Sequence, residues 1–579
     1  MAAIIAEIRR GAYYDSVVLM QLQRALVALA GVIDAGVVMG TAANKEILAQ
    51  SDLLTSEAQA AAADDLVIVV KAESEAAAAA AVAQVDALLT RKRTASEQDY
   101  RPKSLETAAE MLPEAQWVLI SAPGQHAAGV ARAALRLGKH VFLYSDNVSS
   151  ADEVALKKEA AEKGLLVMGP DCGTAIVNGV GLGFANVVRR GHIGLVAASG
   201  TGLQEVSTQI HQLGGGLSQG LGTGGRDLKE AVGAITVRQA LDLLDRDPDT
   251  RVIVLISKPP APKVADQLLQ AARRAGKPVV VDFIGYKPAQ TQLDNVTFVS
   301  TLGAAAHLAV DLANQQTNLP IYQPPNQPTT HPTNQPTTHP TNQKYLRGLF
   351  SGGTLAYEAL LILQDYLPGV YSNIPLDPSY KLQNSLRSRE HTLIDLGEDE
   401  FTVGRLHPMM DNDLRIRRLR QEAEDPETAL ILLDVVLGYG SHPNPASELA
   451  PAIIEAKGLA QLAGRDLAVV AVVVGTDEDP QDFHSQIKQL QQAGAVVFTS
   501  NQQAVEHVGR TLMAAGGVSG LPPVSLDLLA HPLAAINVGL ESFAAALQAQ
   551  GAAVIHVDWR PPAGGNERLA GILARMRGN

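Results

Sequence analysis

Short apolar runs alternate with amphipathic stretches along most of the chain, which is the pattern of α/β proteins. Residues 10–90 give strand, helix, strand, short helix, strand and Ala-rich helix, and this order predicts a small ferredoxin-like α+β unit. The runs "WVLIS", "HVFLYS" and "LLVMG" follow, with helical stretches between them. They predict a parallel Rossmann-like sheet within residues 96–190.

The pattern of a doubly wound domain begins near Gly191 and is repeated later in the chain. Three segments of the second half repeat the pattern of segments in the first half, in the same order. They pair as "IGLVAASGTGLQEVSTQI" with "LRGLFSGGTLAYEALLIL", "RDPDTRVIVLISKPPA" with "EDPETALILLDVVLGYG", and "NVTFVSTLGAAAHLAV" with "GAVVFTSNQQAVEHVG". Three different elements in one shared order favour a duplicated fold. The general likeness of all α/β domains is the alternative.

The segment "PPNQPTTHPTNQPTTHPTNQ" separates the two halves and is rich in Pro, Thr and Asn. It predicts a solvated spacer, and His331 and His339 within it are favoured as spacer residues over metal ligands. The polar stretch "RTASEQDY" at 93–100 marks an earlier boundary. The expected domains are therefore residues 1–95, 96–190, 191–318, 319–343 (linker), 344–516 and 517–579 (tail).

Composition narrows the class of protein. The chain has 579 residues, 46% hydrophobic and 18% charged, as in a folded multi-domain protein. A net charge of −13 without a basic stripe argues against nucleic-acid binding. Cys172 is the only cysteine, which excludes an internal disulfide and favours the cytoplasm. No apolar stretch reaches the roughly 18 residues of a membrane helix, so no membrane span is expected.

Two Gly-rich turns are the first candidates for chemistry. "VAASGTGLQEV" at 196–206 and "FSGGTLAYEAL" at 350–360 each run from a strand into a helix. The first turn of a helix presents free N–H groups and the positive end of the helix dipole, which favours a bound anion. The predicted phosphate-binding residues are Ser199, Gly200, Thr201, Gly202, Ser351, Gly352, Gly353 and Thr354.

Three further loops carry ionisable or Gly-rich groups near predicted strand ends, where open α/β sheets bind ligands. In "GLGTGGRDL", Arg226 is either an oxyanion clamp or a surface residue of a turn. In "GRLHPMMDNDLR", Arg405 is a second candidate, and His407 is either an acid or base or a packed side chain. Substrate contacts are predicted for Gly224, Gly225, Asp227, Asp411, Gly438, Gly440, His442 and Asn444.

Two other features have less specific interpretations. Cys172 in "MGPDCGTA" lacks an adjacent base, so a buried thiol is favoured over a nucleophile. The acidic "GTDEDPQ" at 475–481 suits either Mg²⁺ binding or capping of the next helix. No metal site is predicted.

Several motifs together resemble known proteins. "VMGPDCGTAI", "GHIGLVAASGTGLQEV" and "GLGTGGRDL" resemble the α subunit of succinyl-CoA synthetase, and the second half resembles the ligase domain of its β subunit. The whole arrangement, with "YYDSVVLM", "MGTAANKEIL" and the tail "INVGLESF…HVDWRPPAGGN", resembles the FdrA family. The implied fold class is α/β, with a Rossmann-like CoA-binding-type domain, two flavodoxin-like succinyl-CoA-ligase domains and an N-terminal ferredoxin-like unit.

The chain departs from the synthetase at its catalytic histidine. The synthetase carries a phosphorylated histidine in a Gly-His-Ala-Gly motif, whereas the corresponding stretch from "KPPAPKVADQLL" to "FIGYKPAQTQ" contains no histidine. An ATP-grasp domain and the first CoA-binding strand are also missing from the pattern. We therefore expect the paired turns to hold a phosphoryl group that arrives ready-made.

The resemblance implies an enzyme subunit that handles an acyl phosphate. Its specific version is an oxamate carbamoyltransferase subunit of allantoin catabolism, converting oxalurate and phosphate to oxamate and carbamoyl phosphate, with Arg226, Arg405 and His407 as catalytic candidates. The alternatives are an ADP-forming acyl-CoA synthetase, which would use CoA and ATP with Mg²⁺, and a non-catalytic scaffold. The expected partners are an acyl phosphate or carboxylate, phosphate, and subunits encoded by neighbouring genes.

Overall fold

The computed structural model describes residues 3–12, 16–90, 102–122, 124–315, 343–402, 405–516, 534–538 and 541–557. The predicted boundary at 93–100, nearly all of the linker at 319–343, and the end of the tail lie outside these residues. The chain divides into two compact units, Met1–Ala515 and Gly516–Asn579.

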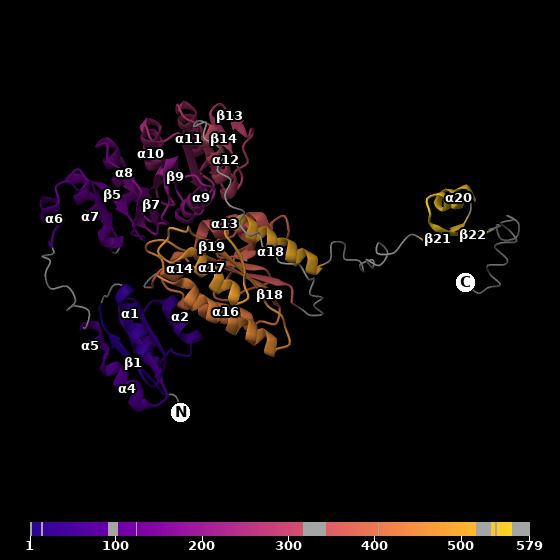
Figure 1. Cartoon of the computed structure of the whole chain (residues 1–579). Helices are drawn as coiled ribbons and strands as arrows, with labels where there is room; N and C mark the ends of the chain where they lie inside the picture. The colour runs from indigo at the N-terminus through magenta and orange to yellow at the C-terminus, as the bar shows by residue number, and fades with distance from the viewer. Residues whose placement is uncertain are drawn as a thin grey trace. The chain divides into compact units, whose positions relative to one another are not determined.

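The N-terminal part is a three-stranded antiparallel sheet with helices, as predicted (Figure 1). The central strand β3 is buried throughout except at Lys71, because helices and neighbouring strands cover it. The strand order is β1-β3-β2. The elements are β1 (Ala3–Arg9), α1 (Ser16–Val27), β2 (Val32–Met39), α2 (Ala42–Gln50), α3 (Ser56–Ala60), β3 (Leu66–Ala72), α4 (Glu75–Ala83) and α5 (Val85–Thr90).

The next part contains the predicted parallel sheet, of order β4-β5-β6. A hairpin then leaves this part and pairs with the next sheet through Ile176 and Gly220. The elements are α6 (Leu105–Met111), β4 (Trp117–Ile120), α7 (Gly124–Arg136), β5 (His140–Leu143), α8 (Ser150–Glu162), β6 (Val167–Met168), β7 (Thr174–Val177) and β8 (Val180–Gly183).

The first doubly wound domain has the strand order β13-β14-β12-β11-β9-β10, extended by the β7–β8 hairpin. Strands β10, β9, β11, β12 and β14 are parallel. The elements are β9 (Arg190–Ala197), α9 (Gly200–Gln212), β10 (Leu217–Gly222), α10 (Ile235–Arg246), β11 (Val252–Ser257), α11 (Pro262–Arg274), β12 (Val279–Phe283), β13 (Gln292–Leu293), β14 (Val296–Phe298) and α12 (Leu302–Gln315).

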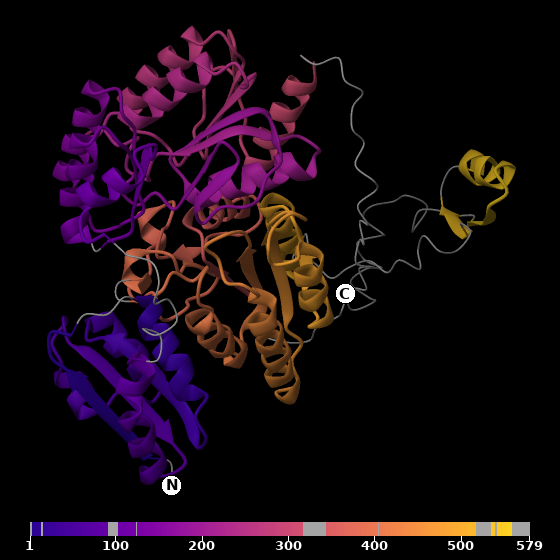
Figure 2. The same cartoon turned by 60° about the vertical axis from the view of Figure 1, so that its left-hand side comes forward.

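The second doubly wound domain has the all-parallel order β16-β17-β15-β18-β19-β20, with helices on both faces (Figure 2). Its strands are β15 (Tyr345–Phe350), β16 (Tyr371–Ser372), β17 (Thr392–Asp395), β18 (Thr428–Val436), β19 (Ala468–Val474) and β20 (Val496–Phe498). Its helices are α13 (Gly353–Leu363), η1 (Pro378–Tyr380), α14 (Asp399–Thr402), α15 (Asp413–Glu424), α16 (Pro445–Leu462), α17 (Phe483–Gln492) and α18 (Asn501–Gly516).

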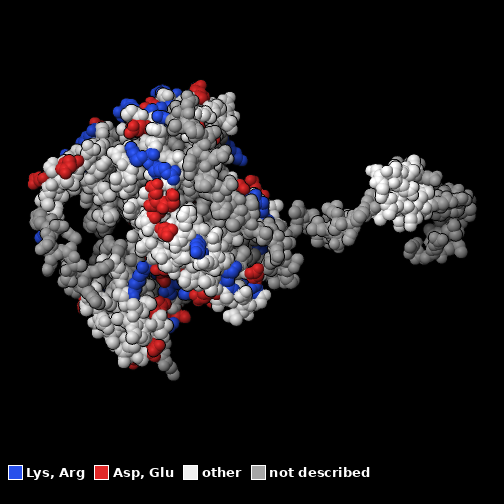
Figure 3. Space-filling view, viewed as in Figure 1, with Lys and Arg blue, Asp and Glu red and all other residues white. Residues whose placement is uncertain are grey.

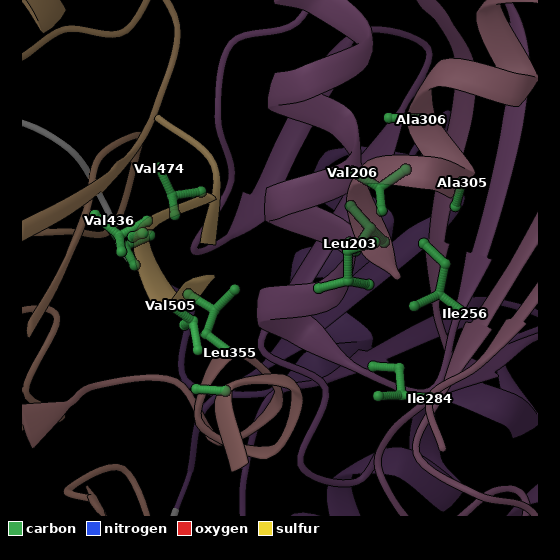
Figure 4. Packing of buried hydrophobic residues seen from close by; sticks show 14 of the residues in the cluster. Leu203, Val206, Ile256, Ile284, Ala305, Ala306, Leu355, Val436, Val474 and Val505 are labelled. Atoms are coloured by element: carbon green, nitrogen blue, oxygen red, sulfur yellow. The ribbon is translucent and has the colours of Figure 1, made fainter. Parts of the chain in front are cut away.

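The two doubly wound domains share one topology. The order β10-β9-β11-β12-β14 corresponds to β17-β15-β18-β19-β20, with α9 matching α13 and α12 matching α18. One hydrophobic cluster joins the domains and includes Leu203 and Val206 of α9 together with Leu355 of α13 (Figure 4). Burial of these apolar surfaces is the main force that holds the two sheets together.

Charged side chains of both signs are interspersed over the face shown in Figure 3. Within the described residues, no helix has the length and apolar character needed to cross a bilayer. The second compact unit contains the parallel pair β21 (Ala534–Val538) and β22 (Ala553–Val557), joined through α20 (Glu541–Ala549).

Candidate anion-binding junction

The first turns of α9 and α13 meet between the two doubly wound domains. Ser199 caps α9, because its Oγ accepts a hydrogen bond from the Gly202 N–H at 2.9 Å. The same Oγ lies 2.5 Å from Thr354 Oγ1 on α13. Gly352 packs against Thr201 so closely that an added Cβ would collide with its side chain. The two predicted turns are therefore brought together.

The two helix N-termini differ in how they are capped. The cap residue of α13 is Gly352, and no side chain within the described part of the chain caps this helix. The first N–H groups of α13 are therefore available to an anion, whereas Ser199 already satisfies one N–H group of α9. Of the two turns, the structure favours "SGGT" as the place for a phosphoryl group.

Lys258 and Asp395 lie beside the open end of α13, and neither was singled out from the sequence. A Cβ added to Gly353 would lie 3.3 Å from Lys258 Nζ and would collide with Asp395 Oδ2. Lys258 Nζ has no hydrogen bond or ion pair among the residues described. Burial raises the pKa of Asp395 to about 7, against the opposing effect of the Lys258 ammonium. The sequence signal that could have pointed to Lys258 and Asp395 is their position at the ends of apolar strands.

Ser351 binds a protein carboxylate instead of facing an open site. It is fully buried, and its hydroxyl lies 2.9 and 3.0 Å from the two carboxylate oxygens of Asp434. Its backbone N–H donates to Asp434 at 2.8 Å, and Arg415 lies 3.4 Å from the same carboxylate. Burial raises the pKa of Asp434, while Arg415 opposes this rise. These contacts favour a structural role for Ser351, and its phosphate role stays a prediction.

His407 lies close to the junction but is packed. A Cβ on Gly397 would lie 3.0 Å from His407 Nε2 and 3.1 Å from Asp395 Oδ1, so Gly397 separates the two side chains. The ring packs on Phe184 at 5.1 Å between centroids, and Nδ1 accepts from the Met409 N–H at 3.3 Å. Burial, together with nearby Arg415, lowers the pKa of His407 to about 4. The imidazole is therefore neutral at pH 7.

The "GLGTGGRDL" loop is held by ion pairs with α8, and the Arg226 charge also acts on Asp399 of α14. Arg226 Nε lies 2.9 Å from Glu153, and its Nη2 donates to the Val148 carbonyl at 2.8 Å. Asp227 is fully buried, 2.7 Å from Lys157 Nζ, and accepts from the Val237 N–H in the first turn of α10. Gly224 has φ +85°, and a Cβ there would strike the backbone of residues 169–170. Gly225 continues this turn.

The loop after β18 contacts the backbone of residues 183–186 and the N-terminal part. Gly438 (φ +106°) and Gly440 (φ +80°) lie so close to the backbone of residues 183–186 that neither has room for a Cβ. His442 lies 3.2 Å from Glu448 and 3.3 Å from Arg24 of the N-terminal part. Asn444 caps α16 by accepting from the Ser447 N–H. These contacts connect parts of the fold, and the predicted substrate contacts stay predictions.

Arg405 and Asp411 line a pocket against the N-terminal part, and the Asp411 N–H donates to the His407 carbonyl at 3.2 Å. Burial raises the pKa of Asp411.

The structure favours structural roles for Cys172 and for the acidic "GTDEDPQ" segment. Burial raises the pKa of the Cys172 thiol to about 12, which suits a packed thiol. After "GTDEDPQ", Asp482 caps α17 by accepting from the Ser485 N–H.

Comparison with protein families defines the class. The family described as CoA-ligase matches residues 349–511, and the CoA binding domain family matches residues 188–285. The chain thus has a succinyl-CoA synthetase-like CoA-ligase architecture on a duplicated α/β fold. The CoA-binding match at 188–285 falls almost entirely within the predicted first ligase-like domain at 191–318, so the assignment of residues 96–190 as CoA-binding-type stays a prediction.

A full-length relative identifies the family. The chain is 43% identical over 495 residues to the uncharacterized protein YahF of Escherichia coli, covering 85% of this chain and 96% of YahF. The chain therefore belongs to the same family as YahF, the FdrA family. It is also 26% identical over 149 residues to the α subunit of malate–CoA ligase of Methylorubrum extorquens, covering 24% of this chain and 49% of that subunit.

A solved structure and a further family model also match. The dinucleotide-forming acetyl-coenzyme A synthetase 1 of Ca. Korarchaeum cryptofilum gives a TM-score of 0.29 at 15% identity, covering 69% of this chain and 82% of that chain. A family described as AllF, heavy metal-associated domain, matches residues 1–105. Residues 1–105 contain neither Cys nor His, so thiolate and imidazole ligands for a heavy metal are missing there.

Proposed function

We propose that this chain transfers an acyl group between phosphate and the thiol of CoA, as the core of an acid–thiol ligase. The observation that carries the proposal is the uncapped end of α13 beside Lys258 and Asp395. An ammonium and free N–H groups at one point suit the leaving phosphate of an acyl phosphate. The matches to CoA-ligase and CoA-binding families support a thiol as the acceptor.

The proposed reaction uses the polar groups at the junction. The CoA sulfur attacks the acyl carbon, the bond from that carbon to the phosphate oxygen breaks, and phosphate leaves with the electron pair. Lys258 and the α13 N–H groups stabilise the charge that grows on this phosphate. Asp395, with a pKa of about 7, is placed to accept the thiol proton at neutral pH.

The lack of a histidine at the phosphohistidine position bears on whether this chain can make an acyl phosphate itself. Residues 258–291 contain no histidine, so a phosphohistidine cannot form at the place where the synthetase carries one. We infer that the chain itself does not use ATP and that the acyl phosphate is supplied to it. A partner that phosphorylates the carboxylate would complete an ADP-forming synthetase.

The test is thioester formation from an acyl phosphate and CoA, with acetyl and succinyl phosphate as probes and phosphate release as a second readout. Lys258→Gln is expected to lower the rate by about 100-fold, the cost of losing one group that stabilises developing charge. Lys263→Gln, on an exposed position of α11, is the matched control. Equal rates for the two variants, or no thioester with either probe, would refute the proposal.

Carbamoyl transfer is the second candidate, and the missing histidine favours it. Carbamoyl phosphate is a ready-made acyl phosphate, so the junction could release its phosphate without a phosphoenzyme. This function predicts phosphate-dependent breakdown of oxalurate in the absence of CoA. The same preparation, tested with oxamate plus carbamoyl phosphate and with CoA plus acyl phosphate, distinguishes the two activities.

A further inference from the structure

Two glutamates reach across from one doubly wound domain to the other. Glu205 on α9 is the sixth residue after the cap residue Ser199, and Glu358 on α13 is the sixth residue after the cap residue Gly352. Glu205 is fully buried, and Glu358 is 2% exposed. The two side chains thus occupy corresponding positions in the duplicated fold, on the two helices whose first turns meet at the junction.

Each glutamate accepts a hydrogen bond from the first turn of a helix in the other domain. Glu205 Oε1 accepts from the N–H of Asn501, the first residue of α18, at 2.9 Å. Glu358 Oε1 accepts from the N–H of Leu302, the first residue of α12, at 2.9 Å. These N–H groups have no partner within their own helices, so the glutamates satisfy donors that burial would otherwise leave unpaired.

Asn501 joins the two contacts. Its backbone N–H bonds Glu205, while its Nδ2 donates to Glu358 Oε2 at 2.8 Å and to the Leu355 carbonyl at 3.1 Å. Gln209 donates to Glu205 Oε1 at 2.5 Å, which fixes that carboxyl group on α9. Removing either glutamate side chain would therefore leave buried donors unpaired in both domains.

The surroundings of Glu205 disfavour its charged form. Burial raises its pKa to about 8, and the nearby charges of Glu358 and Asp434 act in the same direction. Asp282 on β12 is a further carboxyl that interacts with Glu358, and its pKa is raised by burial and by that glutamate. The Arg415 guanidinium lies 3.4 Å from Asp434 and balances the charge of that carboxylate.

The other titratable residues on the elements packed against α9 do not supply a cation to Glu205. Tyr357 on α13 lies against Lys258, and the remaining ones are exposed, namely Arg190, His192, His307 and Asp311. Glu205 is therefore an uncharged acid at pH 7. Its Oε1 accepts the hydrogen bonds, and its Oε2, which has no hydrogen-bond partner among the residues described, carries the proton.

We propose that Glu205 and Glu358 form a reciprocal clasp, which holds the first turns of α9 and α13 in contact and opens when Glu205 loses its proton. Both are positioning residues, which act through the helices that carry the Ser199–Thr354 contact and the uncapped α13 N-terminus. The catalytic consequence rests on the function proposed for the junction. Acyl transfer falls at alkaline pH because the two turns separate.

Ionisation favours the open clasp, because water solvates a carboxylate better than the buried site does. The pKa of Glu205 is about 8 in the closed clasp, against an ordinary value of 4.5 in water. The equilibrium constant for opening therefore rises about 100-fold between pH 6 and pH 9.

Hydrogen–deuterium exchange of the full chain, followed by mass spectrometry and corrected for intrinsic exchange rates, measures this opening. Between pH 6 and pH 9, amides in the first turn of α18 should lose about 100-fold in protection in the unmodified chain. Glu205→Gln keeps the acceptor oxygen but cannot ionise, so its protection should change by less than about tenfold. Glu162→Gln, at an exposed position of α8, is the matched control and should follow the unmodified chain.

The thioester assay adds a second readout. At pH 7, Glu205→Ala should lower kcat by about tenfold or more, because the phosphate-binding turn of α13 is no longer held in place. Glu205→Gln should keep kcat within about twofold of the unmodified chain, since it restores the acceptor. The activity of Glu205→Gln relative to the unmodified chain should then rise from pH 7 to pH 9. Thermal unfolding of each variant checks that it is folded.

Two results would overturn the clasp. One is an equal pH dependence of exchange in Glu205→Gln and the unmodified chain, and the other is full activity of Glu205→Ala. If Glu205→Ala does not fold, the comparison of Glu205→Gln with the unmodified chain still tests the clasp. A lack of thioester formation by the unmodified chain would refute the proposed function instead, and the exchange measurement, which contains neither CoA nor an acyl phosphate, would still decide whether the clasp exists.

Discussion

Burial of the Asp395 side chain changes the pKa of its carboxyl group. Its carboxyl is 2% exposed and accepts a hydrogen bond from the Gly397 N–H at 2.9 Å, yet burial outweighs this bond and the nearby Lys258 charge. The pKa rises from 3.8 to about 7. Water would solvate the charged form better than this site does.

The raised pKa predicts how stability depends on pH. The folded state keeps a proton on Asp395 that the unfolded chain releases, so stability falls as the pH rises from about 4 to about 7. Asp395→Asn keeps the acceptor oxygen and removes the titration. We expect a smaller loss of unfolding free energy between pH 4 and pH 8 in this variant, by up to about 4 kcal/mol.

Urea unfolding at several pH values measures this difference. Asp266→Asn, at an exposed position of α11, should follow the unmodified protein at every pH. Parallel pH profiles for Asp395→Asn and the unmodified protein would show that Asp395 ionises normally.

Cys172 gives a second prediction at this scale. Its thiol is 2% exposed, and burial raises its pKa to about 12, so thiolate is scarce at pH 8. We expect a disulfide exchange reagent to label the native protein more slowly than the urea-unfolded protein by a factor of 100 or more. Spectrophotometric rates in both states test this, and equally fast labelling would contradict burial of the thiol.

At the scale of elements, two helices that look alike in sequence differ in their first turns. Ser199 satisfies an N–H group of α9 and also bonds Thr354, whereas Gly352 leaves the first turn of α13 without a side-chain cap. The Ser199 hydroxyl bonds an N–H group in the first turn of α9, and Gly352 offers no such group to the first turn of α13. We therefore assign the proposed anion site to the second helix.

This difference can be measured with two serine caps. Ser149→Ala removes an exposed cap on α8, where Oγ accepts from the Asp152 N–H, and should cost about 1 kcal/mol. Ser199→Ala removes a cap and also leaves the buried Thr354 hydroxyl without its partner, so about 2 to 3 kcal/mol is expected. Equal losses in urea unfolding would show that the Ser199–Thr354 contact contributes nothing.

For the whole molecule, the loop after β18 decides how closely the domains approach. Gly438 lies against the Ala185 carbonyl, and residues 185 and 439 form an isolated β-bridge. Gly438→Ala would combine backbone strain at φ +106° with a collision across this boundary. The result should be a loss of about 3 kcal/mol or more in unfolding free energy.

Gly464→Ala is the matched control, because its φ is +69° and nothing lies within 4 Å of an added Cβ. Strain alone should cost this variant about 1 kcal/mol. The difference between the two variants in urea unfolding measures the inter-domain contact. If both lose the same amount, the close approach at Gly438 does not contribute to stability.

Patterns along the chain were enough to predict the elements, the duplication and the family. Apolar residues recur every second position on the buried face of a strand and every third or fourth position on the buried face of a helix. This spacing can be read from a short stretch of sequence. The matched order of β9-α9 and β15-α13 was therefore visible in the chain, as was the lack of a histidine in residues 258–291. The structure brings the two Gly-rich turns singled out from the sequence into contact through Ser199 and Thr354.

Which polar groups share a site could be learned from the folded chain alone. Lys258 follows β11 and Asp395 ends β17, and they meet only because the two sheets pack on a common core. Ser351 binds Asp434 because β15 and β18 are neighbouring strands of one sheet, Arg226 binds Glu153 of α8, and Arg405 lines the pocket against the N-terminal part. Local sequence specifies what a residue can do, but contacts between distant segments determine which partner it finds and how much water surrounds it.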